Sequence, residues 1–267
     1  MRLRAVSFLL CLCFHQASVF AQQNIASDGQ APQRDPQALA VVNQAIALLG
    51  GQSALAQIHD CAVQGTATVP QGGPLTSGPF RWQNAESEFR YEYPTIDGIE
   101  VLISNHGKQM IESSGGNQRV RNHSSDSDFP IHLPGLVLLR QVLNTSYSFT
   151  LLEPVSAGGQ SIVRVRTVLE STDYARTVTP QIWSFDAATG LPVSVEYVWL
   201  FRSDTDQKSR NRAVFDNFRA ESGVLLPHRI TVDIEGSLIA TFDLKSVLFN
   251  TNIATSTFET SAAEVKQ

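Results

Sequence analysis

Four potential metal ligands lie close together near the middle of the chain, in the pattern His123-x-x-Asp126-x-Asp128-x-x-x-His132. Imidazole and carboxylate groups bind divalent cations in proteins, and the neighbouring serines and prolines would allow a loop to bring them together. Their spacing is that of neither a helix face nor a hairpin, and no cysteine accompanies them. We therefore interpret the segment as a solvated polar loop and predict no metal site and no cofactor.

Motifs for nucleophilic catalysis are missing from the sequence. It holds no Gly-x-Ser-x-Gly elbow and no Ser-x-x-Lys pair with supporting partners, and Gly107-Lys108 lacks the rest of a phosphate-binding loop. His59-Asp60 falls where a helix is expected to pass into a strand, a position typical of capping or exposed residues. His106 and His228 are expected on the surface. We predict no catalytic residue and no enzyme.

The composition is that of an ordinary folded protein. Of the 267 residues, 42% are hydrophobic and 17% are charged, with 20 basic against 25 acidic side chains. The net charge of −5 and the lack of basic runs give no electrostatic footprint for nucleic acid. Nucleic acid is therefore excluded as a partner. As to the oligomeric state, we expect a monomer.

The N-terminus has the features of an export signal. Arg2 and Arg4 precede an apolar run over residues 5–14, and Val19-Phe20-Ala21 fits a cleavage site. A bilayer-spanning helix needs about 20 apolar residues, so this run is too short to be one. We expect residues 1–21 to be removed as a signal peptide and the remaining chain to be periplasmic.

Cysteine usage agrees with an exported chain that has no disulfide. Cys11 and Cys13 leave with the signal peptide, so Cys61 becomes the only thiol. A single cysteine at the start of an expected strand is typical of a small buried apolar residue rather than a reactive thiol.

Helical spacing of apolar residues occurs in two places. Asp35-Pro36 provides an N-cap and a first-turn proline for a helix that ends at Gly50-Gly51, and a short second turn follows over 53–58. The other helix is predicted over 134–144. The intervening and following segments instead alternate apolar and polar residues, which indicates strands. The expected strands are 61–69, 79–84, 88–93, 98–104, 108–113, 147–153, 161–169, 177–185, 193–202, 213–219, 229–235 and 238–249.

This pattern predicts a mainly β (α+β) fold. A large antiparallel sheet must cover one face, so we expect a single curled sheet, an incomplete β-barrel, with two or three helices over its concave side. Turn residues predict hairpins at Asn105-His106-Gly107, Asp186–Gly190 and Glu235-Gly236-Ser237. The expected organisation is a flexible leader over 22–34, one domain over 35–258 and a flexible tail over 259–267.

Four segments in sequence order resemble the bacterial periplasmic lipoprotein carrier and outer-membrane lipoprotein-sorting family, called LolA-like. They are Phe89-Arg-Tyr-Glu-Tyr-Pro94, Ile103-Ser-Asn-His-Gly-Lys108, Trp183-Ser-Phe-Asp-x-x-Thr-Gly190-Leu-Pro192, and Phe242 to Phe258 with Val247, Asn250 and Ile253 between. The resemblance covers most of residues 36–258 and implies a half-barrel whose helices form a lid over an apolar cavity. It departs from the family in two places: Asn84-Ala85-Glu86 stands where carriers have a lid-holding arginine, and a polar insertion spans 113–127.

The resemblance implies an exported soluble protein that holds acyl chains of a lipid or an acylated protein, with inner- or outer-membrane proteins as further partners. Independently, the aromatic and aliphatic residues at alternating strand positions are expected to line an apolar hollow. We expect these ligand-binding residues to be Phe89, Tyr91, Val101, Ile103, Trp183, Val195, Tyr197, Trp199, Val232 and Phe242. If they only fill a core, the protein is a non-transporting envelope interaction or sensor module. An uncharacterised hydrolase is the third hypothesis.

Overall fold

The computed structural model describes residues 31–70, 75–85, 88–95, 98–105, 109–114, 117–121, 133–200 and 208–259. The described residues from Pro32 onward belong to one compact unit. The predicted signal peptide, most of the predicted leader and tail, and the pattern from His123 to His132 lie outside the described residues.

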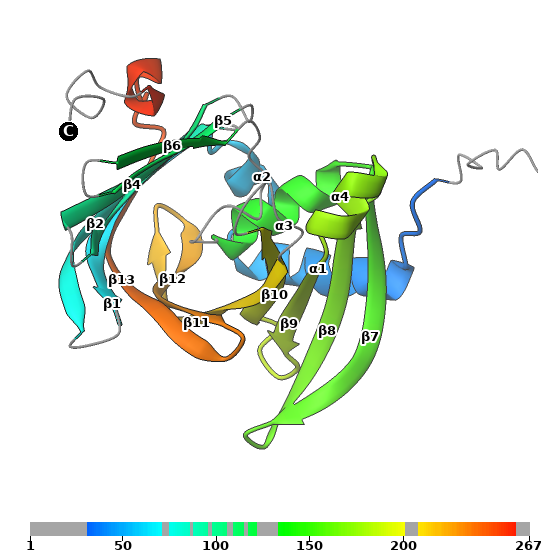
Figure 1. Cartoon of the computed structure of the whole chain (residues 1–267). Coiled ribbons are helices and arrows are strands. Elements are labelled where there is room, and N and C mark those ends of the chain that lie inside the picture. Colours follow the sequence, from blue (N-terminus) through cyan, green and yellow to red (C-terminus); the bar gives the residue numbers. More distant parts are fainter. Residues whose placement is uncertain are drawn as a thin grey trace, which may run out of the picture. The chain divides into compact units, whose positions relative to one another are not determined.

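One sheet of thirteen antiparallel strands dominates the structure (Figure 1), so the predicted mainly β fold is confirmed. The strands are β1 (Asp60–Val69), β2 (Thr76–Ala85), β3 (Glu88–Thr95), β4 (Gly98–Asn105), β5 (Gln109–Ser114), β6 (Asn117–Arg121), β7 (Tyr147–Ala157), β8 (Gln160–Leu169), β9 (Gln181–Asp186), β10 (Pro192–Leu200), β11 (Lys208–Glu221), β12 (Val224–Ile234) and β13 (Ser237–Phe249).

Almost every strand pairs with its neighbours in the sequence. The order across the sheet is β6-β5-β4-β3-β2-β1-β13-β12-β11-β10-β9-β8-β7. Among the described strands, each pair is therefore consecutive in the sequence except β1 with β13. Strands β6 and β7 are the two edges, and no pairing joins them among the described residues. The sheet therefore curls without closing into a barrel.

Turn chemistry accounts for two of the predicted hairpins. Glu235 and Gly236 have φ angles of 50° and 80°, as a two-residue turn with the mirror-image twist requires. In the β9–β10 hairpin, the carboxylate of Asp186 accepts hydrogen bonds from the backbone N–H groups of Ala188 at 2.9 Å and Thr189 at 2.7 Å. The strands on either side of the third predicted turn, β4 and β5, also pair, although residues 106–108 are outside the described residues.

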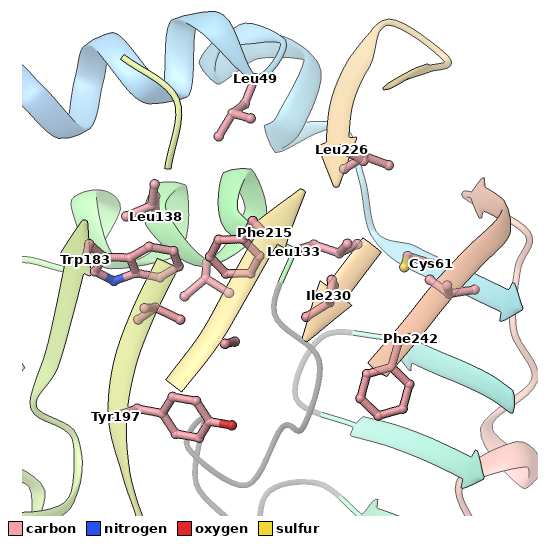
Figure 2. Close-up of a cluster of buried hydrophobic side chains, with 14 of the residues drawn as sticks. Leu49, Cys61, Leu133, Leu138, Trp183, Tyr197, Phe215, Leu226, Ile230 and Phe242 are labelled. Atoms are coloured by element: carbon pink, nitrogen blue, oxygen red, sulfur yellow. The ribbon is translucent and has the colours of Figure 1, made fainter. Parts of the chain in front are cut away.

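Three helices cover the concave side of the sheet, as predicted: α1 (Pro36–Leu48), α2 (Gly51–Ala56) and α3 (Pro134–Leu143). Asp35 caps α1 by accepting a hydrogen bond from the Gln37 N–H at 2.8 Å. The buried side chains of these helices belong to the same hydrophobic cluster as the strands. Figure 2 shows Leu49, from the junction of α1 and α2, and Leu138 of α3 on the side of the cluster that faces Trp183 and Phe215 from the strands.

Two elements differ from the sequence prediction. The strand expected over 177–185 begins only at Gln181, because the preceding residues form a short helix, α4 (Asp173–Val178). The Thr172 hydroxyl caps α4 by accepting from the Ala175 N–H at 3.0 Å, and the Thr179 hydroxyl donates to the Ala175 carbonyl at 2.8 Å. These threonines use their hydroxyls at the helix ends, although they are also good strand formers. In addition, β6 lies within the polar insertion, where no strand was expected.

Candidate functional site

The register of the strands brings most of the predicted ligand-binding residues to the concave face. Trp183 pairs with Val195, and Tyr197 continues the same row two residues further along β10. On the neighbouring strands this face carries side chains that are at most 2% exposed and that belong to the main hydrophobic cluster: Phe89, Tyr91, Trp183, Val195, Tyr197, Val232 and Phe242. These seven residues therefore share one core.

Two predicted residues point the other way. Tyr91 pairs with Leu102, so Val101 and Ile103 lie on the opposite, convex face of β4 with Glu92 and Arg90. Ile103 is nevertheless buried, since the 3-10 helix η2 (Thr255–Phe258) packs against β3 and β4. Because β4 carries apolar residues on both faces, alternation alone could not decide which of them face the hollow. The assignment of Val101 and Ile103 to the concave face was wrong.

The tenth predicted residue, Trp199, pairs through its backbone with Ser209 at the far end of β10. Its side chain is outside the described residues.

Aromatic packing fills the part of the hollow that these residues line. The Trp183 and Phe215 rings stack with their centroids 6.1 Å apart, and Phe242 meets the rings of Phe80 and Tyr91 edge-on at 5.3 and 5.9 Å. Two pockets formed by the described residues are lined by none of the ten predicted residues. Burial of these residues thus comes mainly from the protein's own side chains.

The main hydrophobic cluster instead reaches the surface at a pocket of about 500 Å³ between α2, α3 and the adjoining ends of β1 and β2. Leu55 and Leu139 in its wall belong to that cluster, while Leu143 at its rim is 55% exposed. The pocket, called here the lid pocket, is lined by Leu55, Ala56, Ile58, His59, Asp60, Asn84, Leu136, Leu139, Arg140, Leu143 and Asn144. Its lining thus combines leucine and isoleucine side chains with polar ones.

Asp60 secures the base of the lid pocket. Its carboxylate accepts hydrogen bonds from the Thr251 N–H at 2.7 Å, the Thr251 hydroxyl at 2.9 Å and the Asn252 N–H at 2.8 Å. Burial on its own would raise the pKa of Asp60, but the hydrogen bonds from Thr251 and Asn252 outweigh burial and hold this pKa below its ordinary value. His59-Asp60 was expected to be capping or exposed, but Asp60 is buried and caps no helix: it joins the start of β1 to the segment that follows β13.

Asp60→Asn is expected to lower the free energy of unfolding at pH 7 by about 1–3 kcal/mol, since an amide replaces a carboxylate that accepts three hydrogen bonds. A depressed carboxyl pKa stabilises the fold above the unfolded-state pKa of about 3.9 and loses that contribution as the pH falls through the folded-state value. Urea titrations between pH 3 and 7 should therefore show the gap between variant and parent shrinking toward low pH.

Asp173→Asn is the matched control, because the Asp173 side chain is 99% exposed. It should change stability by no more than about 0.5 kcal/mol. A gap for Asp60→Asn that stays constant down to pH 3 would contradict the assigned role of its charge.

Arg34 holds the C-terminal end of α3, although it does not stand at the sequence position where the family has its arginine, near Asn84. The Arg34 guanidinium donates to the carbonyl oxygens of Val142 at 2.7 Å and Asn144 at 3.0 Å, and it lies over the Phe149 ring at 4.9 Å. The backbone before α1 also pairs with β7, since the Phe149 N–H donates to the Gln33 carbonyl at 2.9 Å. These contacts fasten the segment before α1 to α3 and β7.

A buried row of polar side chains crosses the concave face, and sequence analysis missed it. Thr167 pairs with Gln181, Gln181 with Tyr197, and Tyr197 with Asn211, on the consecutive strands β8 to β11. All four are at most 3% exposed. Gln181 links the sheet to α3, because its Oε1 accepts from Gln141 of α3 at 2.7 Å as well as from the Trp183 indole at 3.0 Å.

Two further residues with potential chemistry, Cys61 and His228, are buried. Cys61 is buried as predicted, and burial, followed by the charge of Asp60, raises the pKa of its thiol and keeps it protonated. His228 was expected on the surface but is 2% exposed, because β12 lies in the middle of the sheet. Its Nδ1 lies 3.0 Å from the Leu244 carbonyl and its Nε2 lies 3.2 Å from the Glu221 carboxylate.

Within the described residues, no group of three or more histidine, cysteine, aspartate or glutamate side chains is placed to hold a metal ion. None of the helices in that part of the chain is both long and apolar enough to cross a membrane.

Solved structures of other proteins share this fold. A LolA superfamily protein from Nitrosomonas europaea is 12% identical, with a TM-score of 0.52 over 84% of this chain and 97% of that chain. A candidate outer membrane lipoprotein-sorting protein domain from Vibrio parahaemolyticus is 13% identical, with a TM-score of 0.51 over 84% of this chain and 96% of that one. A DUF1329 family protein from Desulfovibrio piger is 12% identical, with a TM-score of 0.51 over 83% of this chain and 97% of that one.

At such low identity these similarities concern the fold, and they confirm the LolA-like half-barrel expected from the sequence. No protein-family model matches the sequence, and a search of curated proteins gives no match.

Proposed function

On the basis of its LolA-like fold, we propose that this chain is an exported, soluble periplasmic protein that binds the acyl chains of a lipid or an acylated protein. The observation that carries the proposal is the lid pocket, where the hydrophobic cluster opens to solvent beside α2 and α3. Its volume of about 500 Å³ lies within the range of about 300–1,000 Å³ that small-molecule sites occupy.

The energetics favour an acyl chain as the occupant. Each methylene that leaves water contributes about 0.8 kcal/mol, so eight methylenes contribute on the order of 6 kcal/mol before ordering costs. Leu55, Leu136 and Leu139 offer an apolar wall for these methylenes, and the polar residues of the same lining offer partners for the head of the ligand. Deeper entry would require α3 to move away from the strands, as expected of a lid.

A second function is favoured by the aromatic packing described above. If Trp183, Phe215 and Phe242 keep the hollow filled, the same scaffold serves as a non-transporting interaction or sensor module in the envelope. Native mass spectrometry of the mature protein separates the hypotheses. Bound lipid supports the carrier, a bare chain supports the module, and a bound metal ion supports the hydrolase.

Leu143→Glu tests the lid pocket without disturbing the core, because Leu143 is exposed. An acyl chain lying in the pocket would desolvate the new carboxylate, so the affinity for a fluorescently labelled fatty acid should fall about tenfold or more. Fluorescence titration of the purified mature protein measures this change.

The control is Leu248→Glu on β13, whose leucine is 56% exposed, almost the same as Leu143, and does not line the lid pocket. This variant should bind the fatty acid as the parent does. Equal affinity in both variants and the parent would place the acyl chain elsewhere.

A further inference from the structure

A second pocket lies on the convex face of the sheet and shares no lining residue with the lid pocket. Its volume is about 540 Å³, within the range of about 300–1,000 Å³ that small-molecule sites occupy. Strands β1, β2, β3, β4 and β13 line it. This pocket, called here the outer pocket, presents the side chains of Gln64, Pro79, Arg81, Ile99, Lys245 and Ser246.

A β-bulge shapes the outer pocket. Gln64 pairs with Ser246, whereas the residue after Gln64 pairs with Leu244, so Lys245 is an extra residue without a partner on β1. Leu244 and Val247 are both buried in the core, so the two residues between them face the convex side. Bulges commonly redirect a side chain beside a functional site. Here the bulge adds a lysine to the pocket.

Polar side chains from three neighbouring strands meet beside this bulge. Gln64 of β1 pairs with Arg81 of β2 on one side and with Ser246 of β13 on the other, and Figure 1 shows these strands next to one another. The backbones of β2 and β13 are therefore about 10 Å apart, with β1 between them. The long side chains of Arg81 and Lys245 can both reach a group that lies over Gln64.

The two cations of the outer pocket are not neutralised by the described part of the protein. Arg81 and Lys245 are exposed, and neither forms a salt bridge or a side-chain hydrogen bond with another described residue. Glu92 also lines the pocket, but its carboxylate is already paired, since its Oε1 accepts from the Arg90 Nε at 2.6 Å. Two uncompensated positive charges therefore attract an anion to this pocket.

The charges and donors of the pocket fit a phosphate monoester better than a carboxylate. A phosphate monoester carries a charge of about −1.5 to −2 at pH 7 and three acceptor oxygens. Arg81 offers a planar fork of N–H donors, Lys245 an ammonium group and Ser246 a hydroxyl, each from a different position around the pocket. A carboxylate has a single charge and two oxygens in one plane, so it would leave one cation unpaired.

An apolar side of the pocket sets a second requirement. Ile99 is 50% exposed and Pro79 is also exposed, and both line the pocket. Pro79 lies two residues before Arg81 on β2, so the two side chains share a face. An apolar substituent that covers Pro79 and Ile99 removes apolar surface from water, which favours binding. The pocket therefore suits an ester rather than inorganic phosphate.

We propose that the outer pocket binds a phosphate monoester with an apolar substituent. Arg81 and Lys245 hold the phosphate, and Pro79 and Ile99 pack against the substituent. This site is separate from the proposed acyl-chain site, so either one can fail without the other. Two sources carry this chemistry: a soluble phosphate ester and a lipid whose head group is a phosphate monoester.

Calorimetric titration of the mature protein with phenyl phosphate and with benzoate tests the proposal. The parent should bind phenyl phosphate about tenfold more tightly than benzoate, because the phosphate engages both cations. Its affinity should fall as the salt concentration rises, since the cations are exposed. Arg81→Gln and Lys245→Gln should each weaken the binding of phenyl phosphate about tenfold.

Arg166→Gln is the matched control. Arg166 is likewise an exposed arginine on the convex face, on β8, and it forms no salt bridge with another described residue, but it does not line the outer pocket. This variant should bind phenyl phosphate as the parent does. An equal loss in Arg166→Gln and Arg81→Gln would reveal a general effect of charge and overturn the inference. Equal affinity of the parent for phenyl phosphate and benzoate would also overturn it.

Vesicles identify the source of the phosphate ester. Sedimentation of the protein with phosphatidylcholine vesicles that contain phosphatidic acid assigns the site to a lipid head group, provided that Arg81→Gln abolishes it and Arg166→Gln does not. Binding of phenyl phosphate without such sedimentation assigns the site to a soluble ester. Failure to bind both phenyl phosphate and the vesicles would overturn the inference and leave the proposed function intact, since fatty-acid binding measures that function separately.

Discussion

Val195→Asp should lower the free energy of unfolding by more than about 4 kcal/mol, a large part of the stability of about 5–15 kcal/mol typical of a domain. Val195 is 0% exposed and lies between Trp183 on β9 and Ala213 on β11. No cation is available on these flanking residues to pair with the new carboxylate, so folding would require either desolvating its charge or protonating it. Urea denaturation followed by circular dichroism measures the loss.

Glu196→Ala is the control for this substitution. Glu196 is the next residue along β10, so its half-buried side chain points to the convex face, and the change should be within about 0.5 kcal/mol. The two variants thus test which side chains of β10 point to the concave face and which point to the convex face. A Val195→Asp protein with the stability and fatty-acid uptake of the parent would show that this face neither forms the core nor adjoins a lipid site.

Gly65→Ala should destabilise the protein by about 3 kcal/mol or more, although it adds only one methyl group. A Cβ at this position would lie 2.1 Å from the Asp243 carbonyl oxygen and 2.6 Å from the Phe80 ring. Gly65 sits at the irregularity in the pairing of β1 with β13, which joins the first strand of the sequence to the last in the middle of the sheet. The backbone of β13 would have to move away, so thermal unfolding should shift to clearly lower temperature.

Gly78→Ala on β2 serves as the comparison. Its Cβ would come no closer than 3.1 Å to the Pro94 ring and would meet no backbone atom. We expect a change of less than about 1 kcal/mol there. Equal stability of Gly65→Ala and Gly78→Ala would show that the β1–β13 pairing is looser than the structure describes.

Local patterns in the sequence were sufficient for the class of fold. Alternation of residues such as Phe89 and Tyr91 with charged neighbours identified strands, and Asp35-Pro36 identified the start of α1. The turns at Asp186 and Glu235-Gly236 identified hairpins, and a chain of hairpins already defines most of this sheet. These signals depend on residues a few positions apart, so they can be recognised in the sequence without knowing which strands pair.

The candidate sites depended on contacts that no local pattern contains. The apolar residues of β4 occupy both of its faces, and only the pairing of Tyr91 with Leu102 shows that Ile103 lies on the convex one. The lid pocket forms where residues of α2, α3, β1 and β2 meet. These residues are spread along the chain from Leu55 to Asn144, so no local pattern contains them together.

The sequence by itself determined that this chain forms antiparallel hairpins with helices over one face, because periodicity and turn chemistry are local properties. Only the tertiary structure decided that Thr167, Gln181, Tyr197 and Asn211 form one buried row. Asn211 stands in a polar stretch of β11, where it resembles a solvent-facing residue. Asn211 is nevertheless 0% exposed in the folded chain, because burial depends on which distant segments come together rather than on the neighbours along the strand.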